Sequence, residues 1–167
     1  MSVPDLLTHL CATHLARRGV EARRGRDLPE ADAALFYLGG CLPDLLSRAP
    51  GMFASSPWAL HVLAALHQPV PVLLVAYVLA LLLPEDRRRR YFAWLVAGAA
   101  LHWALDFLQR DLGDAGEFWL FPFSWKTLQL GLFWPDRAVL AIAPLLACIA
   151  LVDWWRRARA VRDIPNL

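Results

Sequence analysis

The sequence predicts an all-α fold, a polytopic membrane helical bundle with about four transmembrane helices. Apolar residue types make up 58% of the 167 residues, compared with about 45–50% in ordinary soluble domains. The apolar residues form long runs that charged or glycine-containing segments separate. Eight tryptophans and eight phenylalanines are typical of a protein with aromatic side chains at the membrane interface. The length favours one domain, residues 1–167.

Four apolar segments are predicted to cross the membrane. They are residues 31–47, residues 57–83 or their apolar part 69–83, residues 91–112 and residues 138–155. A short helix over residues 3–16 precedes them and is shorter than the ~20 residues that a span needs. It crosses, half-inserts or lies flat on the membrane. Pro43 disfavours helical geometry at the residue before it, so we expect the second helix to end or kink at Leu42.

The segments between these helices are expected to be loops. Residues 17–30 and 84–90 are rich in arginine, and residues 47–56 contain turn-forming residue types. Residues 113–136 combine Trp and Phe with turn residues, and residues 153–162 are expected to form a charged tail.

The basic residues predict the orientation of the bundle. Thirteen of the seventeen lie in residues 17–26, 87–90 and 156–162, whereas Arg48, Arg110, Lys126 and Arg137 lie in connections of the opposite parity. Because short cytoplasmic loops carry an excess of Lys and Arg, we expect a multi-pass membrane protein. Its arginine-rich loops and C-terminus would face the cytoplasm.

Ionisable side chains within the apolar runs are the candidate functional residues, because charge at membrane depth is costly. His102 and Asp106 are four residues apart and therefore share one helix face. The other candidates lie in separate segments: His9 with Asp5, Asp44, and His67. Imidazole and carboxylate groups together suit zinc or another divalent metal. The predicted topology places His67 and His102 at similar depth, with the site toward the outer side.

Each candidate also has a simpler interpretation. His102 and Asp106 alone would form an internal charge pair, Asp44 a helix-end cap, and Asp5 a favourable charge at a helix N-terminus. His14 and His61 are expected to be ordinary structural or surface histidines. Several ionisable groups at one depth favour a shared site over these separate explanations.

Other functions find little support. The three cysteines are widely spaced without a CxxC motif, so neither a zinc ribbon nor a disulfide framework is expected. Each arginine cluster adjoins an apolar run, which argues against a nucleic-acid partner. No glycine-rich phosphate loop or G-x-S-x-G elbow occurs, and no basic segment precedes the first apolar stretch, so a cleaved signal peptide is not expected.

The order of several motifs resembles a family of bacterial membrane-bound metal-dependent hydrolases, which includes LexA-regulated inner-membrane proteins and is more distantly similar to zinc-dependent phospholipase C. The motifs are PDLLTHL at 4–10, LGGCLPDLLSR at 38–48, LHQP at 66–69, GAALHWALDFLQR at 98–110, and LFPFSW and LGLFWPD within 120–136. The resemblance implies a location in the bacterial inner (plasma) membrane and a metal site of His9, Asp44, His67, His102 and Asp106. Leu45 stands where family members often carry a second acidic residue.

The sequence therefore favours a membrane-bound hydrolase in which a metal, with zinc expected first, activates water. His9, His67 and His102 would be ligands, Asp44 or Asp106 would complete the site, and the other carboxylate would orient a ligand or act as general base. The expected partners are the lipid bilayer and a lipid-like substrate, with a phosphoester as one class. The alternative is a non-catalytic integral membrane protein with a structural or metal-binding polar cluster.

Overall fold

Helices make up most of the computed structural model, which describes residues 4–110 and 118–162. The predicted all-α class is confirmed, since the described residues contain no strand and only an isolated bridge between Gln109 and Phe133. The α-helices are α1 (Pro4–Arg24), α2 (Glu30–Gly51), α3 (Pro57–Leu66), α4 (Pro69–Leu81), α5 (Arg88–Leu108) and α6 (Pro135–Arg162), with a 3₁₀ turn, η1 (Glu85–Arg87), before α5.

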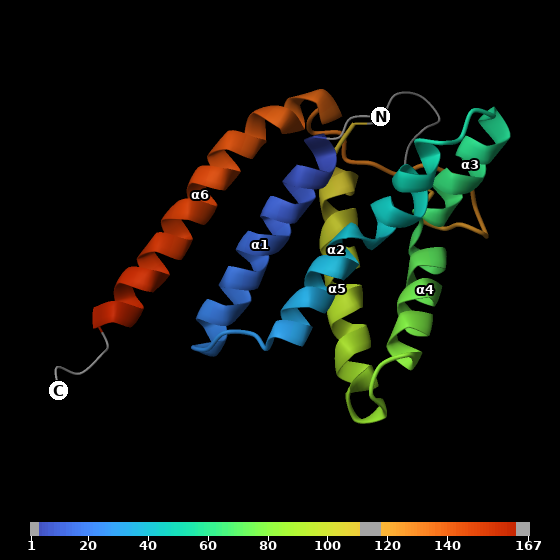
Figure 1. The fold of residues 1–167 in the computed structure, drawn as a ribbon. Coiled ribbons are helices and arrows are strands. Elements are labelled where there is room, and N and C mark those ends of the chain that lie inside the picture. The colour runs from blue at the N-terminus through green and yellow to red at the C-terminus, as the bar shows by residue number, and fades with distance from the viewer. Residues whose placement is uncertain (1–3, 111–117, 163–167) are drawn as a thin grey trace.

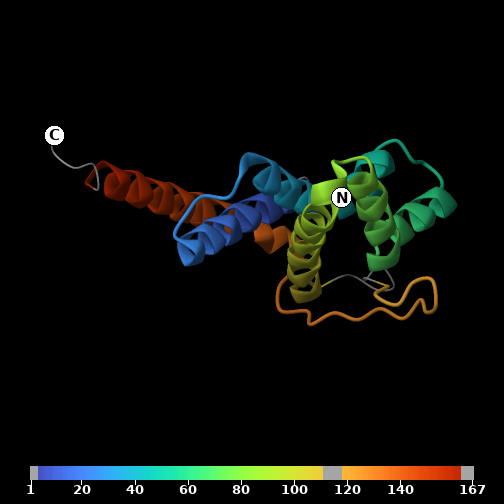
Figure 2. The same ribbon diagram turned by 90° about the horizontal axis from the view of Figure 1, so that it is seen from below.

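The helices form a layered bundle in which α5 contacts α2 on one side and α4 on the other (Figure 1). α1 lies between α2 and α6. Figure 2 shows that α6 runs alongside α1 and extends away from the rest of the bundle. The non-helical segment 118–134 returns from the end of α5 to the start of α6 and passes across the α3–α5 side of the molecule (Figures 1 and 2).

Two glycines bring the backbones of α2 and α5 into direct contact. A β-carbon at Gly98 would lie 2.2 Å from the Phe36 carbonyl oxygen, and one at Gly39 would lie 2.1 Å from the Leu95 carbonyl oxygen. Any larger residue at either position would push the helices apart. The expectation that Gly98 permits a close helix contact is confirmed, and the contact brings His102 on α5 against Gly40 on α2.

A small apolar core lies beside this crossing. Leu42 of α2, Val72 and Ala76 of α4, and Leu95 and Ala99 of α5 are buried together with Trp103. This core fixes α4 against α5, and it therefore fixes the break between α3 and α4, where His67 lies.

Several predicted boundaries were wrong. Residues 17–24 continue α1, because Arg17 and Arg18 pair with Glu21 one turn along the same helix. α2 neither ends at Leu42 nor leaves residues 47–51 as a loop: it continues through Pro43 to Gly51. The expected charged tail, residues 153–162, is the last part of α6.

The predicted four-span topology is not confirmed. By length and composition, one described helical stretch, Glu85–Leu108, can cross a membrane. α3 and α4 pass the same test only together, and they are bent by 62° at the break between them. Helices of this length and composition also occur in the cores of soluble proteins.

Candidate metal centre

The candidate residues from four separate segments meet at one point in the bundle. His9 comes from α1, Asp44 from α2, His67 from the break between α3 and α4, and His102 and Asp106 from α5. Each of these five residues is at most 5% exposed. The side chain of Asp5 lies outside the part of the chain that the structure describes.

Asp106 lies at the middle of the cluster and contacts all three histidines. Its Oδ1 is 3.0 Å from His9 Nε2, and its Oδ2 is 2.9 Å from His67 Nε2 and 3.1 Å from His102 Nε2. The rings of His9 and His102 stack with their centroids 3.9 Å apart. Gln109 Nε2 also donates a hydrogen bond to Asp106 Oδ1, at 3.3 Å. Three ring nitrogens therefore point at one carboxylate.

Asp44 closes the other side of the cluster. Its Oδ1 lies 3.8 Å from both His67 Nδ1 and His102 Nε2, and Arg48 Nε forms an ion pair with the same oxygen at 2.7 Å. Arg48 is the last residue of the LPDLLSR segment and reaches the cluster from the half-exposed side of α2.

Hydrogen bonds at the Nδ1 atoms of His102 and His67 determine which ring nitrogen carries the hydrogen. His102 Nδ1 lies 2.8 Å from the Gly40 carbonyl oxygen, which only accepts, so Nδ1 carries the hydrogen. Ser47 Oγ donates its one hydrogen to the Pro43 carbonyl oxygen, so His67 Nδ1 donates to Ser47 Oγ across 3.1 Å. In their neutral forms both rings therefore direct an Nε2 lone pair toward the Asp106 carboxylate.

This arrangement is incomplete without a positive charge. Two lone pairs facing a carboxylate at 2.9 and 3.1 Å repel one another unless a cation or extra protons lie between them. Extra protons would form ordinary hydrogen bonds, as the geometry between His67 Nε2 and Asp106 Oδ2 allows, yet His102 Nε2 and both carboxylate oxygens of Asp44 lack a hydrogen bond of normal geometry. A buried polar atom without a partner costs about 1–3 kcal/mol. A cation at the centre of the cluster satisfies all of these atoms at once.

The spacing of the atoms fits a metal ion. Metal bonds of about 2.0–2.2 Å place neighbouring ligand atoms about 2.8–3.6 Å apart at bond angles of about 90–110°. The three contacts of Asp106 fall in this range, and Asp44 at 3.8 Å lies just outside it. The donor atoms of His9, Asp44 and His102, and those of His67, His102 and Asp106, each lie within 4.8 Å of one another. Because His102 Nε2 belongs to both groups and binds one ion, the set fits a single metal.

Sequence reasoning missed the residues that orient the histidines. Gly40 and Ser47 act through the contacts described above, and Trp103 donates a hydrogen bond from Nε1 to the His67 carbonyl oxygen at 3.1 Å. The sequence signal that could have identified Ser47 is its spacing, four residues after Pro43 and three after Asp44, which places it close to Asp44 on the same helix. His14 and His61 do not join the cluster: His14 bonds the Tyr37 hydroxyl at 2.7 Å, and His61 stacks on Trp125.

Comparisons with protein-family models, with curated proteins and with solved structures find no match to this chain.

Proposed function

We propose that this chain is a membrane-bound metal-dependent hydrolase that acts on a lipid-like substrate, with phosphoesters as the first class to test. The observation that carries the proposal is the set of two oriented histidines whose Nε2 atoms face the Asp106 carboxylate inside a buried cluster. The resemblance of the motifs to bacterial membrane-bound hydrolases supports the same conclusion.

The donor set favours zinc or another first-row divalent ion. Three imidazoles with one or two carboxylates are typical ligands of such ions, whereas calcium and magnesium prefer oxygen alone. A metal in this position would lower the pKa of a bound water toward neutrality and supply the nucleophile. In the proposal His9, His67 and His102 hold the ion, and Asp106, which touches all three, completes the site.

Asp44 is the better candidate for the general base. It is farther from the histidines than Asp106, and neither of its oxygens makes a hydrogen bond of normal geometry. Its carboxylate is therefore the one whose oxygens are available to accept a proton. The ion pair with Arg48 Nε holds the carboxylate in place.

The burial of the centre favours one competing function, a structural metal site without turnover. All five residues are at most 5% exposed, and structural zinc sites are closed whereas catalytic ones keep a position open for water. The Co²⁺-substituted protein separates the two. A hydrolytic centre with an open position changes its visible absorption spectrum when fluoride is added, and a closed structural centre does not.

Metal analysis of the purified, detergent-solubilised protein tests the proposal directly. We expect about one zinc or similar ion per chain, lost in His102→Ala and in His67→Ala. His61→Ala is the matched control, because His61 lies outside the cluster, and it should keep the ion. Folded wild-type protein that contains no metal and binds none on addition would refute the proposal.

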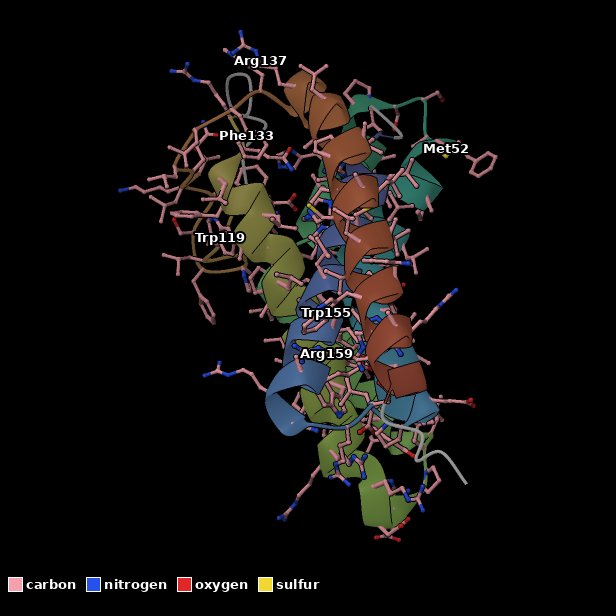
Figure 3. The ribbon with its side chains drawn as sticks, turned by 90° about the vertical axis from the view of Figure 1, so that its left-hand side faces the viewer. Met52, Trp119, Phe133, Arg137, Trp155 and Arg159 are labelled. Atoms are coloured by element: carbon pink, nitrogen blue, oxygen red, sulfur yellow. The ribbon has the colours of Figure 1, made fainter. Side chains whose placement is uncertain are left out.

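We also propose that the bundle is embedded in the inner membrane with its arginine-rich end in the cytoplasm. The α1–α2 connection, the α4–α5 turn and the end of α6 lie at one end of the molecule, and α3, segment 118–134 and the start of α6 lie at the other (Figure 1). Figure 3 shows Arg137 and Met52 at this second end and Arg159 toward the first. Large apolar side chains such as Leu74 (61% exposed) and Leu140 (76% exposed) face outward between them.

Cysteine labelling in intact cells tests this orientation. After the native cysteines are replaced, a cysteine at Ser55 should react with an impermeant maleimide from outside, whereas one at Gly25 should react only after the cells are opened. The reverse pattern would show that the orientation is wrong, and labelling of both from one side would exclude a membrane crossing by α2.

A further inference from the structure

The aromatic segment, residues 118–134, is held against the end of α5 by main-chain hydrogen bonds. Leu130 N donates to the Phe107 carbonyl oxygen at 2.7 Å, Leu132 N to that of Leu108 at 2.8 Å, and Arg110 N to that of Phe133 at 2.8 Å. Within the segment, Trp119 Nε1 donates to the Leu128 carbonyl oxygen at 2.6 Å. These hydrogen bonds hold the segment in place against α5. Two hollows lie along it.

The first hollow combines aromatic rings with positive charge. It has a volume of about 660 Å³ and is lined by His61, Phe118, Trp125, Lys126 and Thr127. The rings of His61 and Trp125 stack at 4.9 Å, and Phe118 meets Trp125 edge-on at 5.3 Å. Lys126, the only lysine in the chain, pairs with no carboxylate of the described residues. An ammonium group beside this aromatic floor favours an anion.

The second hollow is an apolar groove on α5. It has a volume of about 500 Å³, and its floor is formed by the small residues Ala100 and Ala104. Its walls are Trp103, Phe107, Trp119 and Leu128. Trp119 lies beside α5 (Figure 3), with its ring edge-on to Phe107 at 5.7 Å. An open groove with no charged lining residue suits a hydrocarbon chain.

Both hollows share the aromatic segment. Phe118 and Thr127 line the first hollow, and their chain neighbours Trp119 and Leu128 line the second. A ligand that fills both must carry a negative charge at one end and an apolar chain at the other. A free phosphate would use only the charged hollow, and an uncharged lipid would leave Lys126 without a counter-ion.

We propose that the aromatic segment and α5 form a binding site for an anionic phospholipid. The lipid phosphate lies on Lys126 and His61, and one acyl chain lies in the groove over Ala100 and Ala104. The site is separate from the metal centre and needs no bound metal. Trp103 connects the two, because its ring lines the groove while its Nε1 donates to the His67 carbonyl oxygen. A lipid in the groove therefore lies directly behind a candidate metal ligand.

Calorimetric titration of the full-length, detergent-solubilised protein with short-chain lipids tests this site. Dihexanoyl phosphatidylglycerol and dihexanoyl phosphatidylcholine have the same acyl chains and differ in headgroup charge. We expect the anionic lipid to bind at least about tenfold more tightly, a difference of about 1.4 kcal/mol, because the choline ammonium neutralises the phosphate of phosphatidylcholine and is repelled by Lys126. Lys126→Gln should remove this preference, and Lys126→Arg should retain it.

Two matched controls separate the site from general effects. Arg137→Gln removes another exposed positive charge at the same end of the molecule and should leave the preference unchanged. Ala104→Leu should weaken binding of both lipids by filling the groove, whereas Ala93→Leu, on an exposed position of α5 outside the groove, should not.

Three results would overturn the proposal. They are equal binding of the two lipids by the wild-type protein, equal losses in Lys126→Gln and Arg137→Gln, and Lys126-dependent binding of inorganic phosphate as tight as that of the anionic lipid. The last result would identify a phosphate site without lipid. Because none of these measurements requires metal, failure here leaves the hydrolase proposal standing, and loss of the metal leaves this one standing.

Discussion

Two clusters of buried charge lie at opposite ends of this bundle, and only one of them is complete. At the arginine-rich end, Glu21 is 1% exposed and accepts hydrogen bonds from Arg17 Nε at 2.8 Å, Arg18 Nη1 at 2.9 Å and Leu28 N at 3.1 Å. Arg156 from α6 lies 3.4 Å from the same carboxylate. Burial by itself would raise the pKa of Glu21, but these hydrogen bonds outweigh it and lower the pKa.

At the candidate metal centre the buried carboxylates have fewer donors: beside the histidine rings, Asp106 has Gln109 and Asp44 has Arg48. Asp106 faces the Nε2 atoms of His67 and His102, whose rings carry their hydrogen on Nδ1 in the neutral form, and the oxygens of Asp44 lack hydrogen bonds of normal geometry. Proteins rarely leave buried polar groups unsatisfied. The comparison shows that burial of charge alone does not indicate a ligand site. The informative feature is a group of buried polar atoms whose hydrogen-bond partners the protein does not supply.

The largest expected effect is on stability with and without metal. Zinc at a thousand times its dissociation constant should stabilise the wild-type protein by about 4 kcal/mol, and His102→Ala should lose this gain. Glu21→Gln should lower the free energy of unfolding by about 3–5 kcal/mol, equally with and without zinc. Thermal unfolding in detergent, with zinc or with a chelator, measures both.

The two variants serve as controls for each other. A zinc-dependent gain that survives in His102→Ala would place the metal elsewhere. Loss of the gain in Glu21→Gln would show that the two clusters are coupled, and the contrast between a complete and an incomplete cluster would then fail.

A smaller effect is expected from Ser47→Ala, which touches the metal centre only through His67. Without the Ser47 hydroxyl, His67 Nδ1 loses its acceptor and the ring is less firmly oriented. Loss of such an outer hydrogen bond weakens metal affinity by about 10–100-fold. A competition titration with a chromophoric zinc chelator measures the change.

Ser56→Ala is the matched control for Ser47→Ala. Ser56 accepts a hydrogen bond from Ala59 N at the start of α3, on an exposed part of the same connection, so its loss should leave zinc affinity unchanged. Equal zinc affinities for the wild-type protein and Ser47→Ala would contradict the inference that His67 Nδ1 carries a hydrogen and donates it to Ser47.

The sequence predicts which ionisable residues the structure brings together, but not the residues that orient them. His102, Asp106, Asp44, His67 and His9 stand out because ionisable groups are rare in apolar runs. Gly40 and Ser47 do not stand out, because a backbone carbonyl and a common hydroxyl gain their roles only from the crossing of α2 and α5.

The helix boundaries failed for a related reason. Residues 17–24 have the composition of a solvated loop, yet they are helical because Glu21 binds the arginines of its own turn and Arg156, which is far away in the sequence. Such a partner is not visible in a local window. The all-α class depends instead on the apolar runs themselves, and the structure bears it out.

The contact of Gly39 and Gly98 also sets an order of events during biosynthesis. α1 leaves the ribosome first, but His9 has no complete set of partners until α5 has been made and has docked on α2 through these two glycines. α2 and α5 together already hold Asp44, His102 and Asp106. In the proposed metal site, loading would therefore be a late step that follows the pairing of α2 with α5.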